Sequence, residues 1–212
     1  MIVVLGGHRP PPQPNNRAAS GSYTWQLRST AVNSAQMQPA FHFRHCPSCG
    51  RPSTTAPGAI PFHCTNCDFQ YYFNPTVAVA ALIVDESNRV LFIQRAKDPE
   101  KGKLALPGGY VDIDETAEVA LRREVREEVN LEIGPLQFLC TQTNDYFYQG
   151  ITYPVLDLFF VTHAKSLERT AALDGVAGFA WLDPRMVVPT EIAFRSIREA
   201  VRIYASGLKA NS

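Results

Sequence analysis

The 212-residue chain has no excess of charge, no long apolar run and only five cysteines. Its 20 Lys and Arg residues balance its 20 Asp and Glu residues, so no overall positive charge argues for binding to nucleic acid or to a membrane surface. No apolar run is long enough to cross a bilayer as a helix. The opening run MIVVLGG is too short for a secretory signal core and lacks a basic flank, which predicts a cytoplasmic protein.

The amino-terminal stretch is biased towards residues that do not build a core. Residues 1–39 are rich in Pro, Gly, Ser, Asn and Gln and contain the run RPPPQPNN. This composition buries too little apolar surface to offset the entropy of folding, which predicts a disordered tail over 1–39. Met37 stands near its end, so Met1 and Met37 are both candidates for the translation start.

Four of the five cysteines form two C-x-x-C pairs, Cys46 with Cys49 and Cys64 with Cys67. A short polar segment that contains proline separates the pairs. Neighbouring pairs at this spacing are typical of a tetrahedral zinc site, whereas disulfides, the alternative, suit secreted proteins. Four thiolates close the coordination sphere, so this Zn²⁺ is expected to be structural. The sequence therefore predicts a zinc ribbon over residues 41–73.

The acidic run REVREE, residues 123–128, follows a helical spacing. Glu124, Glu127 and Glu128 stand at i, i+3 and i+4, so their carboxylates share one side of a helix predicted over 115–129. Crowded carboxylates repel one another unless a cation lies among them, and Mg²⁺ or Mn²⁺ prefers such oxygen ligands. For this run alone, a solvated helix face held by salt bridges is the plain alternative.

The residues before the run favour a ligand site over a solvated surface. Gly108 and Gly109 follow Pro107 and permit a backbone in which a main-chain carbonyl faces a ligand. Asp112 or Asp114 is expected to cap the helix. The expected buried stripe of the helix consists of Val119, Leu121, Val125 and Val129, with Ala117 and Ala120.

From Gly109 to Leu131 the chain resembles the Nudix box of pyrophosphate hydrolases, G-x5-E-x7-R-E-U-x-E-E-x-G-U, in which U is a bulky aliphatic residue. Eight of the nine specified positions match. The exception is the second glycine, which is Asn130 here, and asparagine tolerates the left-handed conformation that ends a helix. The resemblance implies a hydrolase that cleaves a pyrophosphate bond with metal-activated water.

The resemblance also implies roles for the acids of the box. Glu124 and Glu128 are the leading ligands of a catalytic Mg²⁺ or Mn²⁺, and the Gly109 carbonyl is a further candidate ligand. Glu127 is an additional ligand or the general base. The base can also come from a later loop, in which Asp174 is the acid best positioned.

Other charged residues are expected to support the acids or the substrate. Arg123 can bridge Glu115 and Glu127 and so orient the acids. Arg95, Lys97 and Lys103 lie between a strand end and the two glycines, where they can meet phosphate oxygens, although exposed loop cations commonly have no such specific role. Candidates for stacking on a base are Tyr71, Tyr72, Phe73, Tyr146, Phe147, Tyr148 and Tyr153.

A zinc ribbon followed by the run YYFNPTVAVAALIV resembles the ribbon-bearing Nudix group that includes the NADH pyrophosphatases. Those enzymes carry an SQPWPFP-type motif beyond the box, and nothing like it follows Leu131. The expected substrate is therefore a nucleoside diphosphate joined to another group, such as ADP-ribose, rather than NADH. The resemblance also suggests a homodimer formed through the ribbon. The alternative function is a non-catalytic Nudix regulator whose ribbon docks on nucleic acid or protein.

Alternating apolar residues predict the remaining elements. TVAVAALIVD and RVLFIQRA are expected to form a hairpin around residues 86–88, with further strands near 136–146, 151–163 and 179–183. A last helix is predicted over 190–206, with Thr190 as its cap. The resemblance implies that residues 76–206 form an α/β/α sandwich around a mixed sheet.

Overall fold

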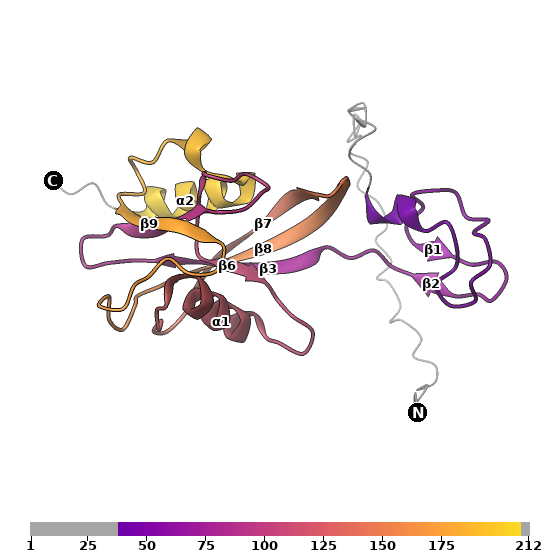
Figure 1. Ribbon diagram of the computed structural model, residues 1–212, viewed down its shortest axis with the longest axis horizontal. Helices are drawn as coiled ribbons and strands as arrows, with labels where there is room; N and C mark the ends of the chain where they lie inside the picture. The colour runs from indigo at the N-terminus through magenta and orange to yellow at the C-terminus, as the bar shows by residue number, and fades with distance from the viewer. Residues whose placement is uncertain (1–37, 209–212) are drawn as a thin grey trace, which may run out of the picture. The chain divides into compact units, whose positions relative to one another are not determined.

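The computed structural model describes residues 38–208. Nearly all of the predicted tail over 1–39, including Met37, lies outside the described residues, as do residues 209–212. Figure 1 shows the described elements in chain order. Within them, no helix is both long enough and apolar enough to cross a membrane.

The segment around the cysteines contains little regular structure. It has one 3₁₀ turn, η1 (Pro39–His42), and one antiparallel strand pair, β1 (Phe62–His63) with β2 (Gln70–Tyr71). Its interior consists of buried Cys46, Phe62 and Cys64, with Phe43, Phe69 and Phe73 packed against them. A core this small is marginal without a metal or a crosslink.

The larger domain contains seven strands, two α-helices and a 3₁₀ turn. Its elements are β3 (Thr76–Ile83), β4 (Val90–Arg95), β5 (Leu104–Ala105), β6 (Gly108–Tyr110), α1 (Ala117–Val129), β7 (Gln137–Tyr148), β8 (Ile151–Thr162), β9 (Val176–Leu182), η2 (Pro189–Glu191) and α2 (Arg195–Gly207). Each of the two α-helices buries one face and exposes the other, as expected of a helix that packs against a sheet.

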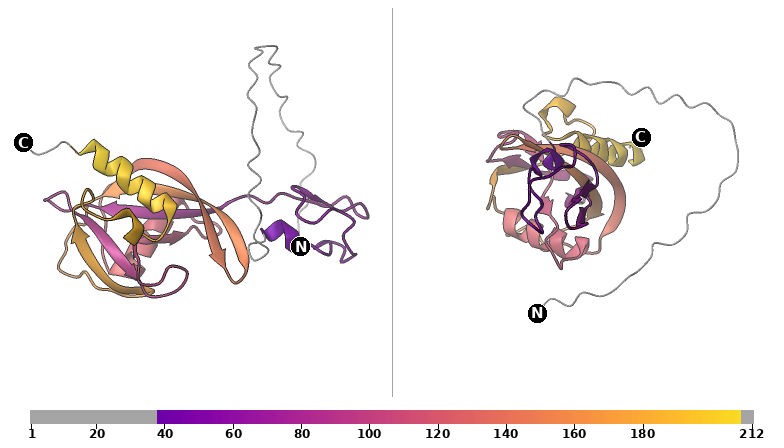
Figure 2. Two further views of the ribbon diagram at one scale, coloured as in Figure 1. Left: turned by 90° about the horizontal axis from the view of Figure 1, so that it is seen from above. Right: turned by 90° about the vertical axis from the view of Figure 1, so that its right-hand side faces the viewer.

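The strands form two sheets between two helices. One sheet is mixed, with the order β6-β3-β8-β7 and a parallel pair β3–β8. The other has the order β5-β4-β9 and is antiparallel. Helices α1 and α2 lie on opposite sides of the strands (Figures 1 and 2). This arrangement confirms the predicted α/β/α sandwich, except that the expected single sheet is divided in two.

The turn between β3 and β4 explains part of this division. Asp85 accepts hydrogen bonds from the backbone amides of Ser87 and Arg89, at 2.9 and 2.8 Å, and so reverses the chain. Beyond the single bridge between Val84 and Val90, however, the two strands pair with other partners. The predicted hairpin is therefore wrong beyond its turn.

The predicted helix starts are also wrong. Helix α1 begins two residues after Glu115, and its cap is Thr116, whose hydroxyl accepts from the Val119 amide at 3.3 Å. Asp114 precedes it with a φ of 67° and so cannot be the cap. Val119 is 54% exposed and does not belong to the buried stripe, which consists of Ala120, Leu121, Val125 and Val129.

Helix α2 begins at Arg195, five residues later than predicted. Pro189 starts the 3₁₀ turn η2, which contains Thr190 and ends at Glu191. Ile192 and Ala193 are buried, Ile192 is extended, and the Ala193 amide donates to the Leu104 carbonyl at 2.8 Å. The buried segment between the turn and the helix thus adds to β5, a tertiary contact that periodicity does not reveal.

Gly108 is the position in the domain where a side chain is least tolerable. Its φ is 152°, and a Cβ there would collide with the Val79 carbonyl and the Ala80 backbone. We expect Gly108→Ala to lower the free energy of unfolding by about 2–4 kcal/mol, measured by chemical denaturation.

Gly150 is the matched control. It also has positive φ, 82°, but a Cβ there would meet nothing within 4 Å. Gly150→Ala should therefore cost only the conformational strain, about 1 kcal/mol. Equal losses from the two substitutions would mean that the β3–β6 contact can relax around a methyl group.

Candidate functional site

The last turns of α1 and two loops enclose a cleft of about 330 Å³ rich in acids, which we call the acid cleft. Its lining consists of Arg95, Lys97, Asp98, Glu124, Glu127, Glu128, Tyr146, Tyr148, Asp174 and Gly175. The helical spacing of the three glutamates explains how one helix supplies them all. The sequence-predicted acids of the box and Asp174 therefore lie together, although Asp174 is 46 positions from the last of them.

Two of the glutamates lie against Gly108 and Gly109 at the start of β6, the segment that we call the glycine loop. The Gly108 amide donates to Glu128 Oε2 at 2.9 Å. At Gly109, a Cβ would lie 2.5 Å from Glu124 Oε1, so the Glu124 carboxylate occupies the space that any side chain would need. Glycine at 109 thus allows an acid to contact the backbone directly.

Burial makes the charges of these two acids costly. It raises the pKa of Glu128 to about 8, even though the Gly108 amide lowers it. Burial also raises the pKa of Glu124, opposed by the Arg123 guanidinium. Carboxylates held in this way form a set of hard oxygen donors that fits a divalent cation such as Mg²⁺ or Mn²⁺.

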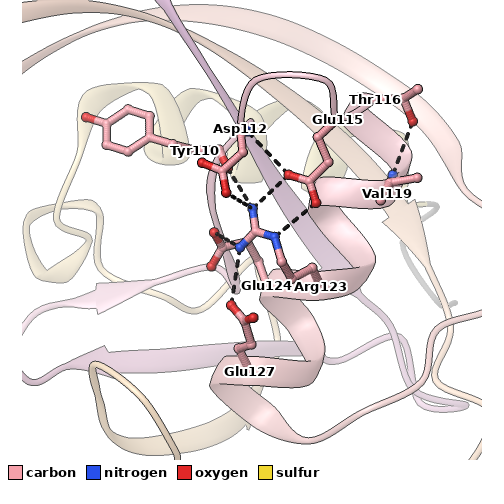
Figure 3. A network of polar contacts seen from close by, with 8 residues as sticks. All are labelled: Tyr110, Asp112, Glu115, Thr116, Val119, Arg123, Glu124 and Glu127. Atoms are coloured by element: carbon pink, nitrogen blue, oxygen red, sulfur yellow. Dashed lines mark hydrogen bonds and ion pairs between the residues drawn. The ribbon is translucent and has the colours of Figure 1, made fainter.

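Arg123 organises the acids around the helix (Figure 3). Its guanidinium contacts both oxygens of Glu115, at 3.0 and 2.9 Å, and Glu124 Oε1 at 2.8 Å. It also donates to Glu127 Oε2 at 3.2 Å and to the Tyr110 carbonyl at 3.1 Å. The bridge expected between Glu115 and Glu127 is therefore present and includes Glu124. Glu127 remains 54% exposed and is held less firmly.

The loop before β9 carries Asp174 to the acid cleft. The Leu173 amide donates to the Glu128 carbonyl at 2.9 Å, which fixes the loop to the end of α1. Asp174 forms an ion pair with Lys97 at 3.0 Å, and both side chains are largely exposed. Lys97 thus joins the glutamates in the lining of the cleft from a loop distant in sequence.

The three candidate phosphate-binding cations occupy different places. Arg95 lines the acid cleft, donates to the Pro99 carbonyl at 2.9 Å and lies 4.9 Å from the centre of the Phe194 ring. Lys97 also lines the cleft. Lys103 is not part of that lining and pairs with Glu100 at 2.6 Å.

Four aromatic rings form a group around Tyr146, and two of them, Tyr146 and Tyr148, line the acid cleft. Tyr146, one of the predicted stacking candidates, is 6.0 Å from Tyr110, 6.4 Å from Tyr148 and 5.8 Å from Phe194, centre to centre. Sequence reasoning missed Tyr110 and Phe194, since one follows the glycine loop and the other precedes α2. Tyr146 and Tyr148 alternate along β7, which is the signal that puts both on one face.

The four paired cysteines form a separate cluster. Sγ of Cys46 lies 3.8 Å from that of Cys67, Sγ of Cys49 lies 3.8 Å from that of Cys64, and all four lie within 4.8 Å of one another. A tetrahedron with metal–sulfur bonds of about 2.3 Å has sulfur–sulfur edges of about 3.8 Å. The cluster therefore fits a tetrahedral metal ion.

The two C-x-x-C turns of this cluster have the same backbone conformation. Cys46 accepts through its carbonyl from the Gly50 amide, and Cys64 accepts from the Asp68 amide, both at 2.9 Å. Gly50 and Asp68 both have positive φ, 73° and 56°. This repeated turn aims both cysteines of each pair at one point.

A cleft with converging carboxylates, a glycine loop and facing cations defines a site of the kind that binds divalent cations and phosphate oxygens. A family model, the NUDIX domain, matches residues 74–201, more than half of the chain. The chain belongs to the NUDIX domain family.

Similar proteins include enzymes that act on nucleotides. The NAD-capped RNA hydrolase NudC of Chromobacterium violaceum is 26% identical over 175 residues, which cover 80% of this chain and 63% of that protein. The ADP-ribose pyrophosphatase of Methanocaldococcus jannaschii is 44% identical over 63 residues, which cover 30% of this chain and 37% of that protein. The chain thus spans less than two thirds of either relative's length.

A solved structure supports the fold. The crystal structure of a NUDIX hydrolase from Nitrosomonas europaea superposes with a TM-score of 0.60 at 24% identity, covering 77% of this chain and 90% of that one. At this identity the likeness shows the fold alone.

The Arg123 network generates a test by substitution. Arg123→Gln leaves Glu115 and Glu124, whose side chains are only 14% and 17% exposed, without their charged partner. We expect this change to lower the free energy of unfolding by about 1–3 kcal/mol, measured by urea denaturation.

Arg126→Gln makes the same chemical change three residues further along the helix. Among residues 38–208, Arg126 pairs only with Glu132, at 3.3 Å, and both side chains are about two thirds exposed. Its loss should cost less than about 0.5 kcal/mol. If Arg126→Gln destabilised the protein as much as Arg123→Gln, the network would have no special role in the fold.

Proposed function

We propose that this protein hydrolyses the pyrophosphate bond of a nucleoside diphosphate joined to a second group, with Mg²⁺ or Mn²⁺ as its catalytic cofactor. The observation that carries the proposal is the pair Glu124 and Glu128, two largely buried acids held against the glycine loop in one cleft. Acids so arranged are costly unless a cation binds them. The relatives named ADP-ribose pyrophosphatase and NAD-capped RNA hydrolase support the class of reaction.

The cation would be held by Glu124, Glu128 and the Gly109 carbonyl, with Glu127 as a further ligand. When bound, it polarises the diphosphate oxygens and acidifies the attacking water. Glu128 keeps its orientation through the Gly108 amide, and Glu124 through Arg123. These contacts hold the acids in place before substrate arrives, which limits the reorganisation that binding requires.

Arg95 and Lys97, which line the same cleft, would neutralise the phosphate groups of the substrate. Lys97 forms an ion pair with Asp174, so its transfer to a phosphate would leave the Asp174 carboxylate without that partner. Asp174 and Glu127, two of the three exposed acids that line the cleft, could then accept the proton of the attacking water.

ADP-ribose is the substrate we favour within this class. The M. jannaschii relative with that activity in its name is 44% identical over the matched 63 residues. The SQPWPFP-type motif of NADH pyrophosphatases does not follow Leu131. Both observations point to a compact sugar, rather than nicotinamide, on the second phosphate.

Substitution of the two buried acids tests the reaction. With ADP-ribose and Mg²⁺, the protein should release AMP and ribose 5-phosphate. Both products are measured by chromatography. Glu124→Gln and Glu128→Gln each remove one charge from the cation site at nearly constant size. We expect each to lower kcat by about two to four orders of magnitude with the fold intact.

Arg126→Gln serves again as the control, because Arg126 does not line the acid cleft and should change kcat by less than about twofold. Small and equal effects of all three changes would count against an enzyme. The non-catalytic regulator would then be the better reading. A panel with ADP-ribose, NADH and other nucleoside diphosphate derivatives identifies the preferred substrate.

We propose that the cysteine cluster binds a structural Zn²⁺. The protein purified without chelator should carry about one zinc per chain by elemental analysis, because four thiolates at tetrahedral spacing form a closed site. Cys46→Ser should lose this zinc. Cys140→Ser should retain it, since Cys140 lies in β7 and outside the cluster. Zinc-free wild-type protein would refute the assignment.

A further inference from the structure

A second, smaller pocket of about 160 Å³ opens beside the acid cleft, and we call it the inner pocket. Arg95, Glu128 and Tyr146 line both spaces, so a single ligand can extend from one into the other. Its remaining lining includes Ala78, Ala80, Gly108, Asn144, Asp157, Phe194 and Ile197. The pocket lies between the mixed sheet and the start of α2.

The inner pocket exists because β3 alternates large and small residues. Ala78 pairs with Asp157 on β8, and Ala80 pairs with Gly108 on β6, so these positions share one face of the sheet. Alanine and glycine there leave a hollow that valine would fill. Val79 points to the opposite face and is buried in the core.

Two polar side chains stand inside this largely apolar hollow. Asn144 lies opposite Val155 on the neighbouring strand, which makes it a diagonal neighbour of Asp157 on the same face. Burial raises the pKa of Asp157, and the nearby Ser196 hydroxyl opposes the rise. Ser196 Oγ is fully buried and does not line the pocket, so the polar groups that a ligand can reach at this end are Asn144 and Asp157. A partly buried carboxylate in an apolar lining is costly unless a donor completes it.

We infer that the inner pocket binds the heterocyclic base of the nucleotide whose diphosphate occupies the acid cleft, and that Asp157 and Asn144 select a base with an amino group. This inference rests on the proposed function. A cavity of about 150 Å³ holds a benzene ring, so the space suits one planar ring system. Tyr146 and Phe194, whose ring centres lie 5.8 Å apart with the planes tilted by 44°, together form one aromatic side of the pocket.

The selectivity follows from hydrogen-bond chemistry. The Asp157 carboxylate only accepts hydrogen bonds, whereas the Asn144 amide can also donate. An amino group on the base donates a hydrogen bond to the Asp157 carboxylate. A carbonyl oxygen at the same place is also an acceptor, so it would be repelled and form no hydrogen bond. Adenine and the carboxamide of nicotinamide both carry the required NH₂ group, and hypoxanthine carries a carbonyl oxygen instead.

Binding of mononucleotides tests the inference without turnover. AMP, IMP and nicotinamide mononucleotide are titrated into the full chain with Mg²⁺ by calorimetry. We expect AMP to bind the wild type at least tenfold more tightly than IMP, because a buried acceptor discriminates against a ligand that lacks the donor. Tighter binding of nicotinamide mononucleotide than of AMP would identify nicotinamide as the base in the pocket.

Asp157→Asn supplies an amide donor at the same size. It should shift the AMP-to-IMP ratio of dissociation constants by at least tenfold in favour of IMP. Asp145→Asn is the matched control, because Asp145 is exposed, belongs to the same hairpin and does not line the inner pocket. Its ratio should equal that of the wild type. Asn144→Leu, which keeps the volume, should also weaken AMP binding if Asp157→Asn fails to fold.

Equal affinity of wild type for AMP and IMP, or no measurable binding of any of the three nucleotides, would overturn the inference. So would an unchanged ratio in folded Asp157→Asn. These outcomes are distinct from failure of the proposed function. Selective AMP binding without hydrolysis of any diphosphate would refute the enzyme and keep the pocket, whereas hydrolysis without base selectivity would do the reverse.

Discussion

The contacts of a single guanidinium group hold the site together. Three glutamates on one helix and a fourth before it repel one another, and Arg123 reaches three of these four acids from the centre of the set. The same group donates to the Tyr110 carbonyl, which ties the glycine loop to the helix. Burial, pairing and backbone contact thus act on the same few atoms, so the acids can be concentrated without unfolding the turn that carries them.

The sheet contributes what the helix cannot, which is space. The small residues Ala78, Ala80 and Gly108 leave the space that forms the inner pocket. The glycine loop brings the backbone close to the acids. Both hollows then meet at the side chains of Arg95 and Glu128. A residue at this junction contacts both ends of an extended ligand, so its substitution affects charge recognition and ring recognition together.

Sequence patterns were most informative where spacing along one element decides the outcome. The i, i+3, i+4 glutamates, the two C-x-x-C pairs and the alternating strands all have local geometry, and the structure has them as expected. Patterns were less informative where separate segments meet. Thr116 rather than Asp114 caps α1 because Asp114 adopts positive φ in a turn.

The same limit applies to the site. Lys97 and Lys103 have the same chemistry six positions apart, and only the loop between β4 and β5 decides that Lys97 faces the acids. The sequence around Asp157 predicts only an apolar strand, and the pairing of Asp157 with Ala78 is what puts it in the lining of the inner pocket. Residues that act through tertiary contact carry no local signal of their role.

The loop between β8 and β9 carries Asp174 and also forms hydrogen bonds with the carboxyl-terminal end of α1. The carbonyls of Glu128 and Val129 accept from the amides of Leu173 and Ala171, at 2.9 and 3.2 Å. The side chain of Asn130 donates to the Arg169 carbonyl at 2.9 Å from a left-handed backbone. Peptide groups that a helix terminus ordinarily leaves to water are therefore satisfied by a distant stretch of chain. Insertions or deletions in that stretch would loosen the turn of α1 that bears Glu128, so its length is constrained although its surface position would ordinarily leave it free to vary.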